Sequence, residues 1–146
     1  MSLFDSSALI ALVRDEPAAD EVSEILRGRD GLASISTVGI AELMDVLVRV
    51  AGRRVEEASA MLGWLLATGI DVVPVDEEIG RLAGTLRSRH WRRDRRLVSM
   101  ADCIVLATGI ITREAIATTD SSLVAAARAE GHPVIVLPDS QGRLPA

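Results

Sequence analysis

Four acidic residues stand apart from the other charged residues of this 146-residue sequence. Each is the only charge in an apolar segment of 13 residues or more: Asp5 in 1–13, Glu42 in 31–44, Asp102 in 97–112 and Asp120 in 115–127. Most of the other acids lie in charge-rich runs such as RDEP and VDEEI, which are typical of solvated surfaces. A buried, isolated carboxylate is costly, so such groups are usually paired with a cation or bound to a metal.

The composition narrows the kind of cation that these acids would bind. All 16 basic residues are arginine, so no lysine is present to neutralise them. Two carboxylates roughly 4 Å apart repel by about 4 kcal/mol at an effective dielectric constant near 20, so a cluster of four requires a cation. Oxygen ligands without histidine or cysteine favour Mg²⁺ or Mn²⁺ over Zn²⁺. The four acids are therefore candidate ligands of a divalent metal.

Each of the four acids also has an alternative structural interpretation. Asp5 and Asp120 would suit the N-cap positions of the helices that follow them. Ser99 and Asp102 have the spacing of a capping box, and Glu42 is compatible with a solvated helix face. Capping and metal binding are compatible, because helix N-termini stabilise anionic groups.

The elements that must position these acids alternate between strand and helix. Short apolar segments predict strands at 2–4, 32–35, 70–75, 115–119 and 133–137. Pro74 favours an edge position or a strand end in the third. Helices are expected at 6–13, 18–28, 37–50, 54–67, 77–88, 99–111 and 122–131. This alternation predicts an α/β fold with a mainly parallel sheet of four to five strands. In such a sheet, sites form beyond the carboxyl ends of the strands, where all four acids are expected.

The four acids lie in four short motifs that follow one another in a specific order. These are FDSSALIAL, GIAELMDVL, SMADCIVLATG and ATTDSSL, and together they span about residues 2–137. The series resembles the PIN-domain ribonucleases, and more narrowly the VapC-type toxins of type II toxin–antitoxin systems. One departure lies at Ser122 and Leu123, where many relatives carry an acidic and an aromatic residue. This departure weakens the case for a second bound metal.

The resemblance implies a three-layer α/β/α PIN-like domain over residues 1–138, followed by a polar tail over residues 139–146. It implies that the four acids are catalytic and hold Mg²⁺ or Mn²⁺ for the hydrolysis of RNA phosphodiester bonds. Ser7 and Thr118 are expected to orient the carboxylates by hydrogen bonding, with local backbone bonding as the alternative. The alternative function is a PIN-like module that binds RNA or a protein partner with little catalysis.

An arginine-rich segment, RSRHWRRDRR at residues 87–96, is the candidate for RNA contact. The net charge of −5 implies no general attraction to nucleic acid, but a local cationic strip would attract RNA phosphates. Trp91 would stack on a base. The alternative is a solvated helix end, with Trp91 packed on the protein body. The residues concerned are Arg87, Arg89, Trp91, Arg92, Arg93, Arg95 and Arg96.

Other features of the sequence indicate protein partners, a cellular compartment and protein classes that can be excluded. The predicted helices at 37–50 and 54–67 are apolar over wide faces, which indicates a surface for a second copy in a homodimer or, by the resemblance, for a cognate antitoxin. The single cysteine, Cys103, and the lack of a signal peptide or membrane span predict a cytoplasmic protein. The absence of lysine argues against a P-loop and against phosphoacceptor domains, which generally use a lysine near their acids.

Overall fold

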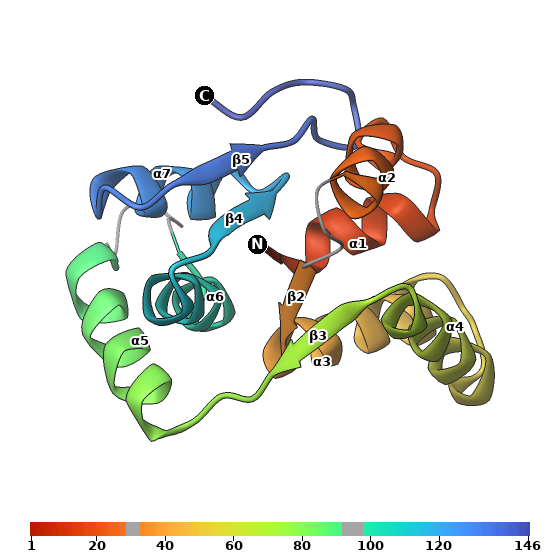
Figure 1. Ribbon diagram of the computed structural model, residues 1–146, viewed down its shortest axis with the longest axis horizontal. Coiled ribbons are helices and arrows are strands. Elements are labelled where there is room, and N and C mark those ends of the chain that lie inside the picture. Colours follow the sequence, from red (N-terminus) through yellow and green to blue (C-terminus); the bar gives the residue numbers. More distant parts are fainter. Residues whose placement is uncertain (29–32, 92–97) are drawn as a thin grey trace.

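The computed structural model describes residues 1–28, 33–91 and 98–146. In these ranges a five-stranded sheet carries helices on both faces (Figure 1). The strands are β1 Ser2–Phe4, β2 Ala33–Ser36, β3 Ile70–Val73, β4 Ala115–Thr118 and β5 Val134–Val136. The helices are α1 Ser6–Val13, α2 Ala19–Arg27, α3 Thr37–Asp45, α4 Val55–Ala67, α5 Glu77–His90, α6 Met100–Thr112 and α7 Ser121–Ala129, and a π-helical segment, η1 Val46–Val50, continues α3. Among the described residues, no helix has both the length and the apolar character needed to cross a membrane.

The strands are ordered β3-β2-β1-β4-β5, and every neighbouring pair is parallel. This arrangement confirms the predicted parallel sheet, and it places β3 at an edge, as Pro74 indicated. The chain runs outward from β1 through β2 to β3 and then crosses to β4 on the other side of β1. The strand order therefore reverses between β1 and β4. Open parallel sheets bind their ligands beyond the carboxyl ends of the strands at such a switch point.

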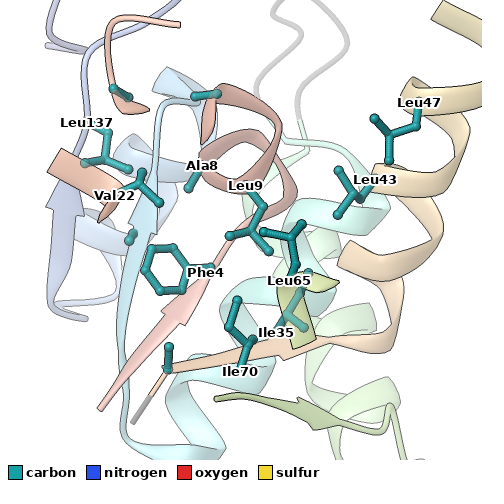
Figure 2. Packing of buried hydrophobic residues seen from close by; sticks show 14 of the residues in the cluster. Phe4, Ala8, Leu9, Val22, Ile35, Leu43, Leu47, Leu65, Ile70 and Leu137 are labelled. Carbon is teal, nitrogen blue, oxygen red and sulfur yellow. The ribbon is translucent and has the colours of Figure 1, made fainter. Parts of the chain in front are cut away.

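Successive residues of the central strands supply the two faces of the sheet. Phe4 and Ala117 pack in one core with α1, α2 and α4, whereas Leu3 and Ile116 pack in another with α5, α6 and α7. Figure 2 shows the first core around the ring of Phe4, the only phenylalanine of the sequence, which is fully buried. Full burial of such a side chain contributes about 1.5–3 kcal/mol. The predicted three-layer α/β/α fold is confirmed.

Several predicted element ends differ from those observed. The helix expected over 37–50 is α-helical only as far as Asp45 and then becomes π-helical. The strand expected over 70–75 ends at Val73, because Pro74 has no N–H to donate to a ladder. In the described residues the second strand runs from Ala33 to Ser36, and the Ser36 hydroxyl also caps α3 by accepting from the N–H of Val38 at 3.3 Å.

The segment after β5 turns back beside the sheet instead of extending away from it (Figure 1). The N–H of Leu137 donates to the carbonyl of Thr118 at 2.9 Å, which continues the β4–β5 pairing by one residue. Asp139 then closes a turn in which its Oδ1 accepts from the N–H groups of Gln141 at 2.8 Å and Arg143 at 2.9 Å. The division into a domain over 1–138 and a tail over 139–146 stays a prediction.

Candidate active site

Asp5 lies directly after β1, at the N-cap of α1, and is only 4% exposed. Its Oδ2 accepts hydrogen bonds from the hydroxyl of Ser7 at 2.5 Å and from that of Thr118 at 2.9 Å. Burial raises the pKa of the Asp5 carboxyl, the two hydroxyl bonds oppose this rise, and the charge of Asp120 adds to it. Both hydroxyl residues singled out in the sequence therefore contact the most deeply buried of the four acids.

Asp120 lies just beyond β4, at the N-cap of α7. Its Oδ1 accepts from the backbone N–H groups of Ser122 at 2.6 Å and Leu123 at 3.0 Å. Its own N–H donates to the hydroxyl oxygen of Thr118 at 3.0 Å. Because that hydroxyl also donates to Asp5, Thr118 connects the acids that follow β1 and β4 across the switch point.

Glu42 comes from α3, which follows β2 on the other side of β1. Its Oε2 accepts a hydrogen bond from the hydroxyl of Ser6 at 2.9 Å. Burial raises the pKa of Glu42, Ser6 opposes the rise, and the charges of the other three acids add to it. Ser6 was not among the predicted site residues. Its only signal in the sequence is its position next to Asp5 in the FDSS motif.

Asp102 lies in the first turn of α6 and forms the capping box that its spacing from Ser99 indicates. The N–H of Asp102 donates to the Ser99 hydroxyl at 3.0 Å, and the Ser99 N–H donates to Oδ2 of Asp102 at 2.7 Å. The box does not use the other carboxylate oxygen, Oδ1. Burial raises the pKa of Asp102, the bonds with Ser99 oppose the rise, and the charges of Asp120 and Asp5 add to it.

The four carboxylates thus come from four different elements. They repel one another beyond the carboxyl ends of the strands. Among the ion pairs of the described residues, none includes any of them. Within residues 1–28, 33–91 and 98–146, no three histidine, cysteine, aspartate or glutamate side chains are arranged to hold one metal ion together. Mg²⁺ usually keeps several waters and binds through only one or two carboxylates and substrate phosphates. The oxygen donors are of the type that Mg²⁺ prefers, and an ion at this site would take at most two of them as direct ligands.

The sequence matches the PIN domain family over residues 2–129. The chain belongs to this family. Its resemblance to PIN domains is thereby confirmed, whereas a comparison with curated proteins gives no match.

Several solved structures share the fold of this PIN domain at low sequence identity. VapC20 of Mycobacterium tuberculosis is 20% identical with a TM-score of 0.69, and the match covers 86% of this chain and 95% of that one. VapBC2 from Rickettsia felis, bound to a promoter DNA fragment, is 12% identical with a TM-score of 0.68 and coverage of 91% and 95%. A toxin–antitoxin complex from Klebsiella pneumoniae is 21% identical with a TM-score of 0.63 and coverage of 83% and 88%.

The arginine-rich segment of this PIN domain begins at the C-terminal end of α5. The side chain of Arg87 donates to the backbone carbonyl of Val98, and Arg89 forms an ion pair with Glu130 at 2.6 Å. Glu130 follows the last turn of α7, about 15 Å along the helix axis from Asp120, so this pair lies away from that carboxylate. Trp91 is 49% exposed and is therefore not buried against the protein body. The remaining predicted contacts, Arg92, Arg93, Arg95 and Arg96, lie outside the described residues, and RNA contact by this segment stays a prediction.

Replacing Thr118 by valine tests the hydroxyl that joins Asp5 to Asp120. We expect Thr118→Val to lower the free energy of unfolding by about 1–3 kcal/mol, because the buried Asp5 carboxylate loses a donor and the Asp120 N–H loses its acceptor. Urea unfolding measures this loss, and Thr118→Ser is the matched control because it keeps the hydroxyl. A Thr118→Val chain with the free energy of unfolding of wild type would show that the hydroxyl does not hold the two acids in place.

Proposed function

We propose that this PIN domain is a Mg²⁺- or Mn²⁺-dependent endoribonuclease that hydrolyses RNA phosphodiester bonds. The observation that supports it most directly is the meeting of four carboxylates at the switch point, with no cationic partner in the described ion pairs. Carboxylates alone would repel an RNA phosphate. A divalent ion held by these residues would supply the positive charge that binds the phosphate.

In this mechanism the residues of the site orient the carboxylates that would hold the ion. Asp5, Glu42, Asp102 and Asp120 would hold the ion directly or through water. When bound, a divalent ion polarises the scissile phosphate and lowers the pKa of the attacking water. Ser7 and Thr118 hold one oxygen of Asp5, and Ser6 holds one oxygen of Glu42. Such contacts restrict each carboxylate to one orientation, which favours repeated capture of the ion in the same geometry.

We further propose that the chain is the toxin of a toxin–antitoxin pair and acts in the cytoplasm. VapC20 is described as a toxin that cleaves the sarcin–ricin loop, and the Klebsiella structure is a toxin–antitoxin complex. An apolar cavity of about 490 Å³ between α1 and α4 supports a protein partner, because the side chain of Trp64 at its rim is 64% exposed. The partners proposed are a cognate antitoxin and a second copy of the chain. A small open reading frame for a DNA-binding protein beside this gene would support the pairing.

RNA cleavage by the purified chain, freed of any copurifying antitoxin, tests the enzymatic proposal. We expect a panel of single-stranded and hairpin RNAs to be cut with Mg²⁺ or Mn²⁺, EDTA to stop the reaction, and excess metal to restore it. Cleavage that resists EDTA would point to a metal-independent contaminant. Metal-independent RNA binding without cleavage would favour the alternative of a catalytically weak binding module.

A further inference from the structure

A cavity of about 470 Å³ joins the carboxylate site to the segment that follows β5. One wall comes from the site itself, through Ser7, Thr119, Asp120 and Ser121. The other wall comes from Asp139, Arg143, Leu144 and Pro145. This volume lies within the roughly 300–1,000 Å³ of pockets that bind small organic ligands. The cavity is therefore large enough to receive a ligand group next to Asp120.

Among the described residues that line this cavity, Arg143 is the one with a positive charge. The turn around Asp139 holds the Arg143 side chain in place. The side-chain Nε and one terminal nitrogen of Arg143 donate to Oδ2 of Asp139 at 3.0 and 2.9 Å. The backbone N–H of Arg143 donates to Oδ1 of the same residue at 2.9 Å. Gly142 occupies the left-handed position that closes the turn, with φ of 76°. A guanidinium carries five N–H donors in a planar fork, so the ion pair leaves three for another acceptor.

The second wall also offers apolar surface beside this cation. Leu144 is 68% exposed and Pro145 is partly exposed, and both line the cavity next to Arg143. The side-chain hydroxyl of Ser121 adds a polar group on the opposite wall. A ribonucleotide combines these three chemistries, with an anionic phosphate, a hydroxyl-bearing ribose and an apolar base face. The cavity thus offers one contact for each part of such a unit, and it lies beside Asp120, one of the acids that would hold the catalytic ion.

We propose that this cavity binds the nucleotide of the RNA substrate that flanks the scissile phosphate, with Arg143 contacting a phosphate oxygen and Leu144 and Pro145 contacting the base. This inference rests on the proposed ribonuclease function and adds a substrate-binding residue to it. The segment after β5 becomes one side of the RNA groove. Guanidinium groups suit this role, because their planar fork matches phosphate geometry.

Equilibrium binding of a short single-stranded RNA tests the contact without cleavage. The measurement uses Asp102→Asn chain with and without Arg143→Ala, over a range of salt concentrations. One phosphate contact to single-stranded nucleic acid contributes about 0.7 to the slope of log K against log salt. We expect Arg143→Ala to lower the magnitude of this slope by about 0.7 and to weaken binding by about fivefold at 0.1 M salt.

Arg49→Ala is the matched control, because Arg49 also pairs with an aspartate four residues away and its side chain is equally exposed, at 70%. We expect the control to leave both affinity and salt slope unchanged. An RNA series in which single phosphates are replaced by neutral methylphosphonates then locates the contact. One replacement should weaken binding to the Arg143-containing chain and have no further effect once Arg143 is alanine.

The outcomes separate this inference from the function on which it rests. A chain that neither binds nor cleaves RNA overturns both proposals. A chain that cleaves RNA, but whose Arg143→Ala variant binds with the affinity and salt slope of the Arg49→Ala control, overturns only the role of Arg143. A changed affinity without any methylphosphonate position that depends on Arg143 would also overturn the phosphate contact.

Discussion

Asp102→Asn is expected to reduce RNA cleavage by about a thousandfold while leaving the fold intact. The carboxylate stands at the start of α6, where one oxygen is engaged in the capping box and the other is not used by it. Asparagine keeps an acceptor for the Ser99 N–H but removes the negative charge that would hold a divalent ion. Lewis-acid catalysis is worth several kcal/mol, and each 1.36 kcal/mol corresponds to a factor of ten in rate. Single-turnover cleavage with saturating Mg²⁺ measures the loss.

Asp76→Asn is the matched control for this prediction. Asp76 also caps a helix, since its Oδ1 accepts from the N–H of Ile79 at 2.9 Å, and asparagine is an equally good N-cap. We expect the Asp76→Asn chain to cleave at the wild-type rate and both variants to give the wild-type circular dichroism spectrum. Wild-type cleavage by Asp102→Asn would remove Asp102 from the site. Equal losses in both variants would show that the effect follows from replacing any helix-capping aspartate and not from metal chemistry at Asp102.

The convergence of the four acids was predictable, because it depends on topology and not on side-chain detail. Asp5 and Asp120 follow strands that are neighbours in the sheet, so parallel pairing brings their backbones to the same edge. Their isolation in apolar segments is visible in the sequence alone. The element ends were less predictable. The change from α- to π-helix after Asp45 alters only the register of the backbone hydrogen bonds, and no residue type marks it.

The hydrogen-bond partners within the site could be predicted only in part. Ser6 and Ser7 are identical neighbours, yet Ser7 contacts Asp5 two residues before it, whereas Ser6 contacts Glu42 on another helix. The first contact is local and follows from N-cap geometry. The second depends on how α1 and α3 pack, which no short pattern records. For the same reason the run of arginines in the sequence does not indicate that Arg89 pairs with Glu130, 41 residues away.

Metal-free wild-type protein is expected to lose stability, relative to Asp102→Asn, as the pH rises. The pKa values of Asp5, Glu42 and Asp102 are raised in the folded chain above their ordinary values of 3.8, 4.5 and 3.8. Between the ordinary and the raised values, the folded state binds more protons than the unfolded state, so the free energy of unfolding falls as the pH increases. Above the raised pKa values the carboxyls are charged in the folded chain, and the loss of stability that their charges cause, which is the penalty, has reached its full size. Well below the ordinary pKa values the carboxyls are protonated in both the folded and the unfolded chain, and the penalty is absent.

The comparison with Asp102→Asn isolates this contribution from that of acids outside the site. Asp45, Glu57 and Asp139 have lowered pKa values because of bonds to arginine residues, so their contributions change with pH in the opposite sense. Those contributions are common to both chains and cancel in the difference. We expect Asp102→Asn to be more stable than wild type at neutral pH without metal, and the difference to shrink toward zero as the pH falls to about 4. Urea unfolding at several pH values in EDTA measures it.

Divalent metal should reverse this order at neutral pH, because the ion binds the folded carboxylates and not the unfolded chain. A ligand at one hundred times its dissociation constant stabilises the folded state by about 2.7 kcal/mol. We expect Mg²⁺ to raise the stability of the wild-type chain and to have a much smaller effect on Asp102→Asn. Equal stabilisation of both chains by Mg²⁺ would place the ion elsewhere. A stability difference between the two chains that does not vary between pH 4 and 8 would show that the charge of Asp102 is not what destabilises the metal-free site.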